Sequence, residues 1–156
     1  MLFKKSKNKN LLYSPTNGRL ISLGEVNDPL FSSKSLGNGY AVKPSSGEVF
    51  SPVAGQVVSI FPTKHAIGIR TKSKDEFLLH VGIDTVELDG EGFEIAVQEN
   101  DYVDQESLIL TVDLDLLSAK GYETDIMVIM TTQVHDIELD VENMTISHGD
   151  VVGKIK

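Results

Sequence analysis

Short runs of alternating apolar and polar residues follow one another along most of this chain. Aliphatic, β-branched and aromatic residues dominate the runs, and clusters of glycine, proline, asparagine and serine interrupt them about every 8 to 12 residues. The clearest runs cover residues 18–23, 40–43, 55–61, 66–71 and 76–81. Short strands at this spacing are typical of all-β folds, so we predict an antiparallel β-sandwich or barrel.

One segment has helical signals instead. Asp113 can cap the N-terminus of a helix over residues 114–120, and Gly121 can take the left-handed conformation that ends a helix. The segment is only about two turns long. Helix is therefore predicted to be a minor part of the fold.

Length and composition fit one globular domain. The chain has 156 residues, 40% of them hydrophobic, which is enough to bury a core. Residues 1–10 contain four lysines and no acidic residue, and we predict that they form a flexible basic tail outside the fold. Residues 11–156 then make up the single domain.

Composition also excludes several functions. There is no cysteine, which rules out disulfides, thiolate zinc sites and thiol nucleophiles. No apolar run approaches the ~20 residues of a membrane span and the N-terminus lacks a secretory signal, so we expect a cytoplasmic protein without stable membrane insertion. The formal charge of −9 argues against nucleic acid as a partner, because clustered lysine and arginine bind phosphates.

Negative charge is concentrated after residue 80. Residues 80–106 contain nine acidic residues and no lysine or arginine. Such a region favours a basic protein partner, although a merely solvated acidic face would have the same composition.

The predicted strand over residues 76–81 carries a histidine among aliphatic side chains. Alternate residues of a strand share a face, so His80 shares one with Leu78. A core histidine with one satisfied hydrogen bond would fit this pattern. The next residues weaken that interpretation, because Gly82 lets a ligand or partner approach the backbone and Asp84 can act as an acceptor near the ring.

A second histidine, His65, stands at the start of the preceding β run. If residues 66–71 and 76–81 pair as an antiparallel hairpin centred between residues 72 and 73, His65 falls opposite His80. Directly opposed residues have Cβ atoms only ~5 Å apart. Two imidazoles at that distance could contact the same phosphoryl group or metal ion.

The sequence that begins at His80 is distinctive. It reads His-Val-Gly-Ile-Asp-Thr-Val-Glu-Leu over residues 80–88 and continues with Gly90, Gly92 and Phe93. It resembles the phosphohistidine signature of the glucose-family IIA domain of the bacterial phosphoenolpyruvate-dependent sugar phosphotransferase system. Four further segments resemble the same family and extend the match over residues 13–156, namely 36–44, 51–55, 63–66 and 113–120.

This resemblance implies an activity. A IIA domain is a phosphotransferase component of sugar transport, and here it would accept a phosphoryl group from the phosphocarrier HPr on His80 and donate it to a cysteine of a IIB domain during glucose-type sugar uptake. His65 would support the transfer, Thr63 would hold the His65 ring, and Asp84 would lie beside the site. No cofactor is required, and a monomer is expected.

The resemblance also implies a docking surface, made of apolar and acidic side chains around the histidines. Its residues are Asp28, Leu30, Phe31, Leu36, Phe61, Ile67, Leu78, Asp84 and Val86. For each apolar member, ordinary core packing is the alternative interpretation.

The chain departs from the family at three places. Lys74 stands where the family usually has glycine, which predicts a different hairpin bend. Residues 126–132 lack the usual proline and asparagine, so no contact residue is predicted there. The tail lacks the amphipathic helix that some relatives use on membranes, so membrane docking is not expected.

Two other classes of protein are alternatives. A regulatory or zinc-binding module could hold zinc with His65, His80 and Asp84, although no local metal signature is present and zinc at the two histidines alone would need a ligand supplied by a partner. A swinging-arm carrier needs a modified lysine at a hairpin tip with acidic or methionine flanks, and neither Lys64 nor Lys74 has them.

The other two histidines, His135 and His148, lie in polar surroundings without a partner motif. We predict that both are surface residues, and we assign them no function.

Overall fold

The computed structural model describes residues 10–140 and 143–156, so the predicted tail lies outside the described residues apart from Asn10. The strands are β1 (Leu11–Tyr13), β2 (Gly18–Ser22), β3 (Asn38–Pro44), β4 (Glu48–Phe50), β5 (Gly55–Ile60), β6 (Ala66–Arg70), β7 (Glu76–Val81), β8 (Phe93–Ile95), β9 (Tyr102–Val103), β10 (Leu108–Val112), β11 (Ile126–Met130), β12 (Ile137–Leu139), β13 (Thr145–Ile146) and β14 (Val151–Ile155). The helical segments are η1 (Leu23–Glu25), α2 (Pro29–Ser32), η2 (Thr85–Leu88) and α3 (Leu114–Ala119).

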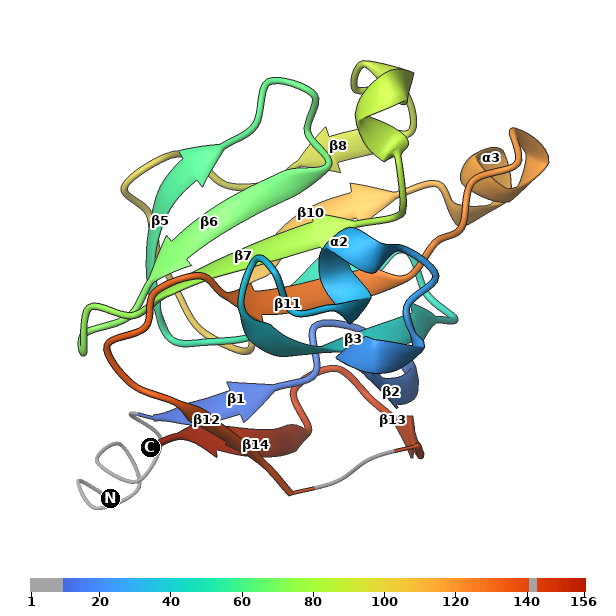
Figure 1. The fold of residues 1–156 in the computed structure, drawn as a ribbon. Helices are drawn as coiled ribbons and strands as arrows, with labels where there is room; N and C mark the ends of the chain where they lie inside the picture. The colour runs from blue at the N-terminus through green and yellow to red at the C-terminus, as the bar shows by residue number, and fades with distance from the viewer. Residues whose placement is uncertain (1–9, 141–142) are drawn as a thin grey trace.

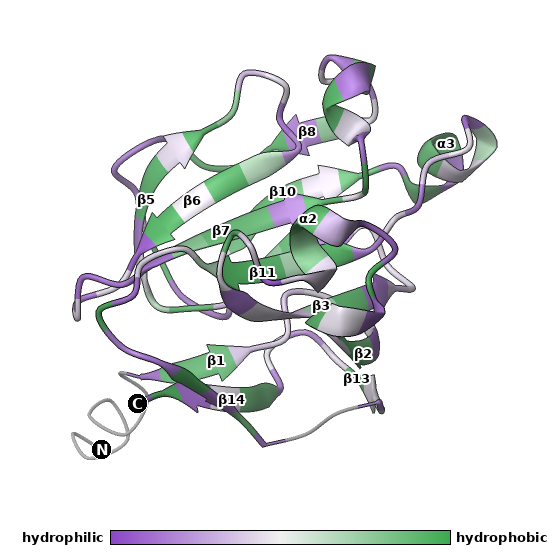
Figure 2. Ribbon diagram, in the orientation of Figure 1, coloured by the Kyte–Doolittle hydropathy of each residue, from purple (hydrophilic) through white to green (hydrophobic). Residues whose placement is uncertain are grey.

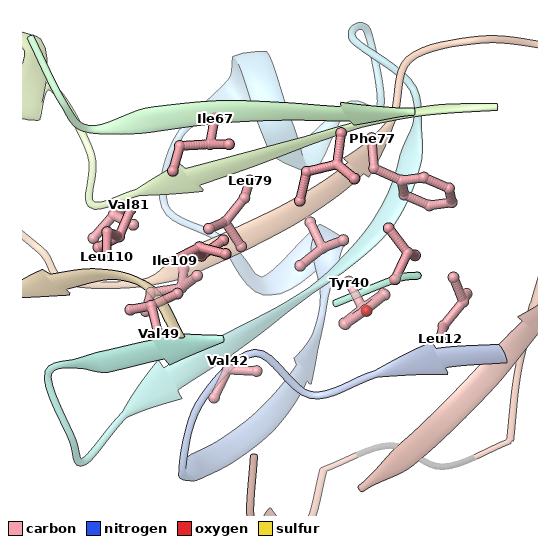
Figure 3. Close-up of a cluster of buried hydrophobic side chains, with 14 of the residues drawn as sticks. Leu12, Tyr40, Val42, Val49, Ile67, Phe77, Leu79, Val81, Ile109 and Leu110 are labelled. Carbon is pink, nitrogen blue, oxygen red and sulfur yellow. The ribbon is translucent and has the colours of Figure 1, made fainter. Parts of the chain in front are cut away.

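The described strands form antiparallel sheets around one core (Figure 1). The largest sheet has eight strands in the order β13-β2-β3-β11-β7-β6-β5-β9, and the smaller sheets have the orders β1-β14-β12 and β4-β10-β8. Ile67 and Leu79 of the large sheet belong to the same buried cluster as Leu12 of β1 and Leu110 of β10 (Figure 3). The predicted all-β antiparallel sandwich is confirmed.

Apolar side chains are buried on both faces of the middle of the large sheet. Hydrophobic residues make up much of β6, β7 and β11 (Figure 2). In β7 the burial alternates, with Phe77, Leu79 and Val81 in the main core. All five residues of β11 are buried, and its outward-facing Met127 belongs to a second cluster that includes side chains of η1 and α2. The Cα of His80 pairs with that of Met127, so His80 adjoins this outer apolar layer.

The β6–β7 hairpin has a register one residue away from the prediction. Ala66 pairs with His80, and His65 lies just before β6. The His65 carbonyl accepts a hydrogen bond from Val81 N–H at 2.8 Å. The turn is closed by Thr71 N–H donating to the carbonyl of Asp75 at 2.9 Å. Three residues therefore lie between Thr71 and Asp75. The turn is centred on Ser73, whereas the predicted turn was centred between residues 72 and 73.

The predicted helix is confirmed, but the expectation of a single helical segment is wrong. Asp113 Oδ1 accepts a hydrogen bond from Leu116 N–H at 3.0 Å, and Gly121 has a φ of 87°. The helix α2, four residues long with Asp28 as its cap and Pro29 at its start, was not predicted from the sequence. One turn of helix has no measurable periodicity. None of the helices in the described ranges has the length and hydropathy of a membrane span.

The turn between β6 and β7 buries a carboxylate. Lys74 has a φ of 71°, a left-handed conformation that glycine adopts more easily, in agreement with the altered bend predicted there. Next to it the Asp75 side chain is fully buried, and its Oδ2 accepts a hydrogen bond from Ser73 Oγ at 2.6 Å and lies 2.8 Å from His135 Nδ1. The His135 side chain is 38% exposed, so the surface prediction holds, but the ring also anchors a buried acid.

We predict that His135→Ala lowers the free energy of unfolding by about 1–3 kcal/mol, because it leaves the buried Asp75 carboxylate with one hydrogen bond fewer. Urea denaturation at neutral pH measures the change. His148→Ala is the matched control, since that ring is exposed and stacks on Phe50 at a centroid distance of 3.9 Å. Equal stability losses in the two variants would contradict the anchoring role.

Candidate functional site

Two imidazole rings contact each other on the outer face of the large sheet. The ring centroids of His65 and His80 are 4.8 Å apart with an interplanar angle of 83°. Phenyl rings adjoin both of them, with Phe61 5.6 Å from His65 and Phe31 4.9 Å from His80. The four rings form a continuous row, so the prediction that the two histidines lie together is confirmed despite the shifted register.

A tight turn brings His65 to this position. Lys64 N–H donates to the Phe61 carbonyl at 2.8 Å, and Phe61 N–H donates to the Ala66 carbonyl at 3.1 Å. Lys64 has a φ of 63°, which lets the chain reverse before β6 begins. Ala66, opposite His80 in the neighbouring strand, has only a methyl side chain. The turn and the small neighbour together place the His65 ring against His80.

Thr63 orients the His65 ring, as the resemblance implied. Its Oγ1 lies 2.8 Å from His65 Nδ1. When the hydroxyl donates this bond, the imidazole proton is on Nε2, which then points away from the threonine as a donor.

His80 exposes only one of its ring nitrogens. Its Nδ1 is buried, and no group in the described residues makes a hydrogen bond of good geometry with it. The side chain as a whole is partly accessible, so solvent or a partner reaches Nε2. A phosphoryl group can therefore bind only at Nε2.

Burial keeps both rings neutral at physiological pH. It lowers the pKa of His80 to about 4, with a further contribution from His65, and the Gly82 backbone and Asp28 oppose the shift. Burial also lowers the pKa of His65, against the opposing effect of the Thr63 backbone. The side chain of His65 is the less exposed of the two. The pKa shift of His80 is nevertheless the larger, because His80 lies within β7, between β11 and β6, and against the Phe31 ring.

The loop after β7 is held in a strained but well-bonded conformation. Gly82 has a φ of 79°, and a Cβ there would come within 2.4 Å of the Thr85 side chain. Gly82 N–H donates to the Asp125 carbonyl at 2.7 Å, and Ile83 N–H donates to the Glu123 carbonyl at 3.1 Å. No larger residue fits at Gly82 without displacing the loop next to His80.

The two acidic residues predicted at the site have different surroundings. Asp28 caps α2 through a 3.0 Å hydrogen bond from Leu30 N–H and acts electrostatically on His80. Asp84 is exposed and left-handed, with a φ of 61°, and its charge acts on Tyr122 instead. Asp28 is thus the acid whose charge acts on the His80 ring, and the position expected of Asp84 beside the site stays a prediction.

The predicted docking surface divides into exposed and buried residues. Leu30, Phe61 and Val86 are 49%, 39% and 51% exposed. Ile67 is fully buried in the main core, and Phe31 is only 3% exposed within the second cluster. Both offer a partner little surface to contact, and their part in docking stays a prediction.

The remaining two apolar members, Leu36 and Leu78, are half-buried and pack against the second cluster. They support the surface from beneath. The exposed apolar rim is thus smaller than the sequence suggested.

An acidic depression of about 350 Å³ adjoins the loop after β7, and the sequence analysis did not foresee it. Its lining residues are Ile83, Asp84, Glu87, Lys120, Gly121, Tyr122 and Glu123. Tyr122 Oη donates to Glu87 Oε1 at 3.0 Å, and this carboxylate raises the pKa of the phenol. These residues come from segments about thirty-five positions apart, so no local pattern connects them.

The geometry does not favour the zinc alternative with Asp84 as third ligand. Within residues 10–140 and 143–156, no three histidine, aspartate, glutamate or cysteine side chains are arranged to bind a metal ion. His65 and His80 alone offer too few ligands for a zinc site.

Comparisons with known proteins agree with this geometry. The family described as "phosphoenolpyruvate-dependent sugar phosphotransferase system, EIIA 1" matches residues 10–135. The glucose-specific EIIA component of Halalkalibacterium halodurans is 42% identical over 136 residues, which are 83% of this chain and 79% of that protein. The structure of glucose permease IIA from Mycoplasma capricolum has 40% identity and a TM-score of 0.84, with 94% of this chain and 96% of that chain covered.

Larger proteins also contain a similar region. The glucose-specific EIICBA component of Streptococcus pneumoniae is 46% identical over 120 residues, covering 77% of this chain but 16% of that protein. The glucoside-specific EIICBA component of Staphylococcus carnosus is 46% identical over 121 residues, covering 78% of this chain and 18% of that protein. This chain therefore spans less than a fifth of each of these relatives.

The lowered pKa of His80 predicts a pH dependence of stability. Unfolding returns the imidazole to its ordinary pKa of 6.5, so between pH 6.5 and about 4 the unfolded chain binds a proton that the folded chain does not. The free energy of unfolding should therefore fall as the pH falls through this window. His80→Gln removes the titrating group and should show a smaller fall in urea denaturation at stepped pH. Parallel curves for the two proteins would contradict the shift.

Proposed function

The chain belongs to the EIIA 1 family of the phosphoenolpyruvate-dependent sugar phosphotransferase system, and from this premise we propose that His80 accepts a phosphoryl group from HPr and delivers it to a cysteine of a IIB domain during glucose-type sugar uptake. The observation that carries the proposal is a neutral, partly buried imidazole with an accessible Nε2 beside a second imidazole. A phosphoryl carrier needs this combination, because a protonated ring has no lone pair to attack with.

The transfer is a displacement at phosphorus. The Nε2 lone pair of His80 forms a bond to phosphorus while the bond to the donor atom of phospho-HPr breaks, and that electron pair stays with the donor. The proton on the buried Nδ1 is retained, so the phosphorylated ring is cationic and can leave as neutral imidazole. In the delivery step the IIB thiolate attacks phosphorus, the nitrogen–phosphorus bond breaks, and its electron pair returns to Nε2.

His65 assists without becoming phosphorylated. Thr63 Oγ1 lies 2.8 Å from His65 Nδ1, and we assign the hydroxyl as the donor, which leaves the imidazole proton on Nε2. From there His65 can donate a hydrogen bond to an oxygen of a phosphoryl group on the neighbouring His80. Such a donor matters most while the charge on those oxygens changes, so it acts on the rate of transfer.

The surroundings of the histidines suit a protein partner with basic and apolar groups. Leu30, Phe61 and Val86 are exposed, Phe61 lies against the His65 ring, and Asp28 and Asp84 add negative charge. Opposite charge steers partners together and apolar contact excludes water from the transfer. The relatives named EIICBA components support a permease as one partner, with its IIB part as the acceptor. We infer a cytoplasmic monomer as the working form.

No cofactor is required in this scheme. A zinc ion at His65 and His80 would need a further ligand supplied by a partner, because the described residues bring no third ligand to the pair.

We predict that His80→Ala abolishes phosphorylation and leaves the fold intact. The assay combines phosphoenolpyruvate, enzyme I and HPr with the variant, and mass spectrometry at neutral or alkaline pH detects one added phosphate. His148→Ala is the control and should be phosphorylated like the unmodified protein, because its exposed ring lies against Phe50 and not against the histidine pair. Phosphate on the His80→Ala protein would refute the assignment.

We predict that His65→Gln still allows phosphorylation of His80 but slows delivery to a IIB domain by ~10²- to 10³-fold, because glutamine keeps an N–H donor but can neither protonate nor titrate. A single-turnover assay with each phosphorylated protein measures the rate. Thermal stability should change little. Delivery at the rate of the unmodified protein would show that His65 is only a neighbour.

A further inference from the structure

The Phe31 ring lies against the imidazole of His80. The ring centroids are 4.9 Å apart and the planes are inclined by 58°. Phe31 is 3% exposed, so a partner docked on this face reaches almost none of it. Phe31 therefore contributes to the site mainly through its contact with the His80 imidazole.

The short helix α2 holds Phe31 in place at both of its ends. Asp28 caps the start, through its side chain to Leu30 N–H and through its carbonyl to Phe31 N–H at 3.0 Å. At the other end, Lys34 N–H donates to the Phe31 carbonyl at 3.0 Å, and Lys34 has a φ of 63°. A single turn of helix would not persist alone in water, so these bonds and the packing beneath it keep it formed.

The packing beneath Phe31 is the second apolar cluster. The other buried members of this cluster are Ile21, Leu23, Val26, Ala41, Ile83, Met127 and Ile129. Met127 is also the cross-strand partner of His80, so the same cluster supports the histidine from its strand and from above. The phenyl ring consequently has little freedom to move away from the imidazole.

Phe61 provides a contrast within the same row of rings. It meets His65 at 5.6 Å and 79°, but it is 39% exposed and available to a partner. The two phenylalanines thus have similar neighbours and different accessibility.

From this contrast we infer that Phe31 is a positioning residue: its ring fixes the orientation of the His80 imidazole and shields one of its faces from water, so that Nε2 points to the incoming phosphoryl group before a partner binds. This role rests on the proposed phosphoryl transfer and adds to it a residue that acts through the His80 imidazole.

Physical considerations support the assignment. A histidine ring rotates readily about its outer torsion unless neighbours pack against its faces, and misorientation of an attacking atom is costly in rate. Removal of water from a ring also disfavours its charged form, which agrees with the lowered pKa of His80. The rings of His65 and Phe31 both pack against the imidazole, with centroids 4.8 Å and 4.9 Å from it, and Nδ1 is its buried nitrogen.

Phe31→Leu and Phe61→Leu form a matched pair of variants for the test. Each exchanges a phenyl ring for an apolar side chain beside one histidine. In Phe31→Leu the pKa of His80, followed by NMR of the imidazole protons without any partner, should rise from about 4 toward 6.5. The rate of phosphorylation at saturating phospho-HPr should fall about tenfold with an unchanged KM. In Phe61→Leu the KM should rise, and the titration of His80 should stay the same.

The titration and the kinetics separate the possible failures. If neither the unmodified protein nor the variants accept phosphate from HPr, the proposed function fails, and the titration still decides whether Phe31 controls the ring. If Phe31→Leu titrates like the unmodified protein, or if it raises only the KM as Phe61→Leu does, the positioning role is overturned. Phe31→Met, which keeps more of the buried volume, replaces Phe31→Leu if circular dichroism shows that the leucine variant is unfolded, and the same two outcomes then apply.

Discussion

The contact between the rings of His65 and His80 is the interaction on which the site depends. Two imidazoles 4.8 Å apart on a largely apolar sheet face cannot both become imidazolium cations without a large electrostatic cost. Burial and this mutual effect keep His80 neutral, and a neutral ring has the lone pair that a phosphoryl acceptor needs. The chemistry thus follows from where the sheet places the rings rather than from an unusual side chain.

The sheet can supply this environment because it is covered on both faces. The main core fills the space between the eight-stranded sheet and the two smaller sheets, and η1 and α2 cover part of the opposite face. His80 lies where that outer cover ends, beside the buried Met127 and beneath Phe31. An imidazole fully inside either layer would be inaccessible, and one on an uncovered face would be hydrated.

Left-handed backbone conformations adjoin both histidines. Lys64 precedes His65 with a φ of 63°, and Gly82 and Asp84 follow His80 with φ values of 79° and 61°. Such conformations cost free energy, so they persist only where surrounding contacts compensate. Hydrogen bonds from Gly82 and Ile83 to the segment before β11 provide that compensation in the loop after His80.

The sequence by itself determined the local features of this protein. The alternation in β7 placed His80 on the face opposite Phe77, Leu79 and Val81, the cap at Asp113 located α3, and the residues from His80 onward identified the family. These features depend on neighbours within a few positions. Only the tertiary structure decided the features that involve residues far apart in the sequence. It moved the partner of His80 from residue 65 to Ala66 through the length of a turn, buried Phe31 and Ile67 by closing other elements over them, and joined Asp75 to His135 across sixty positions. The physical reason is that burial and electrostatic contact depend on all the groups around a side chain, and folding brings these together from every part of the chain.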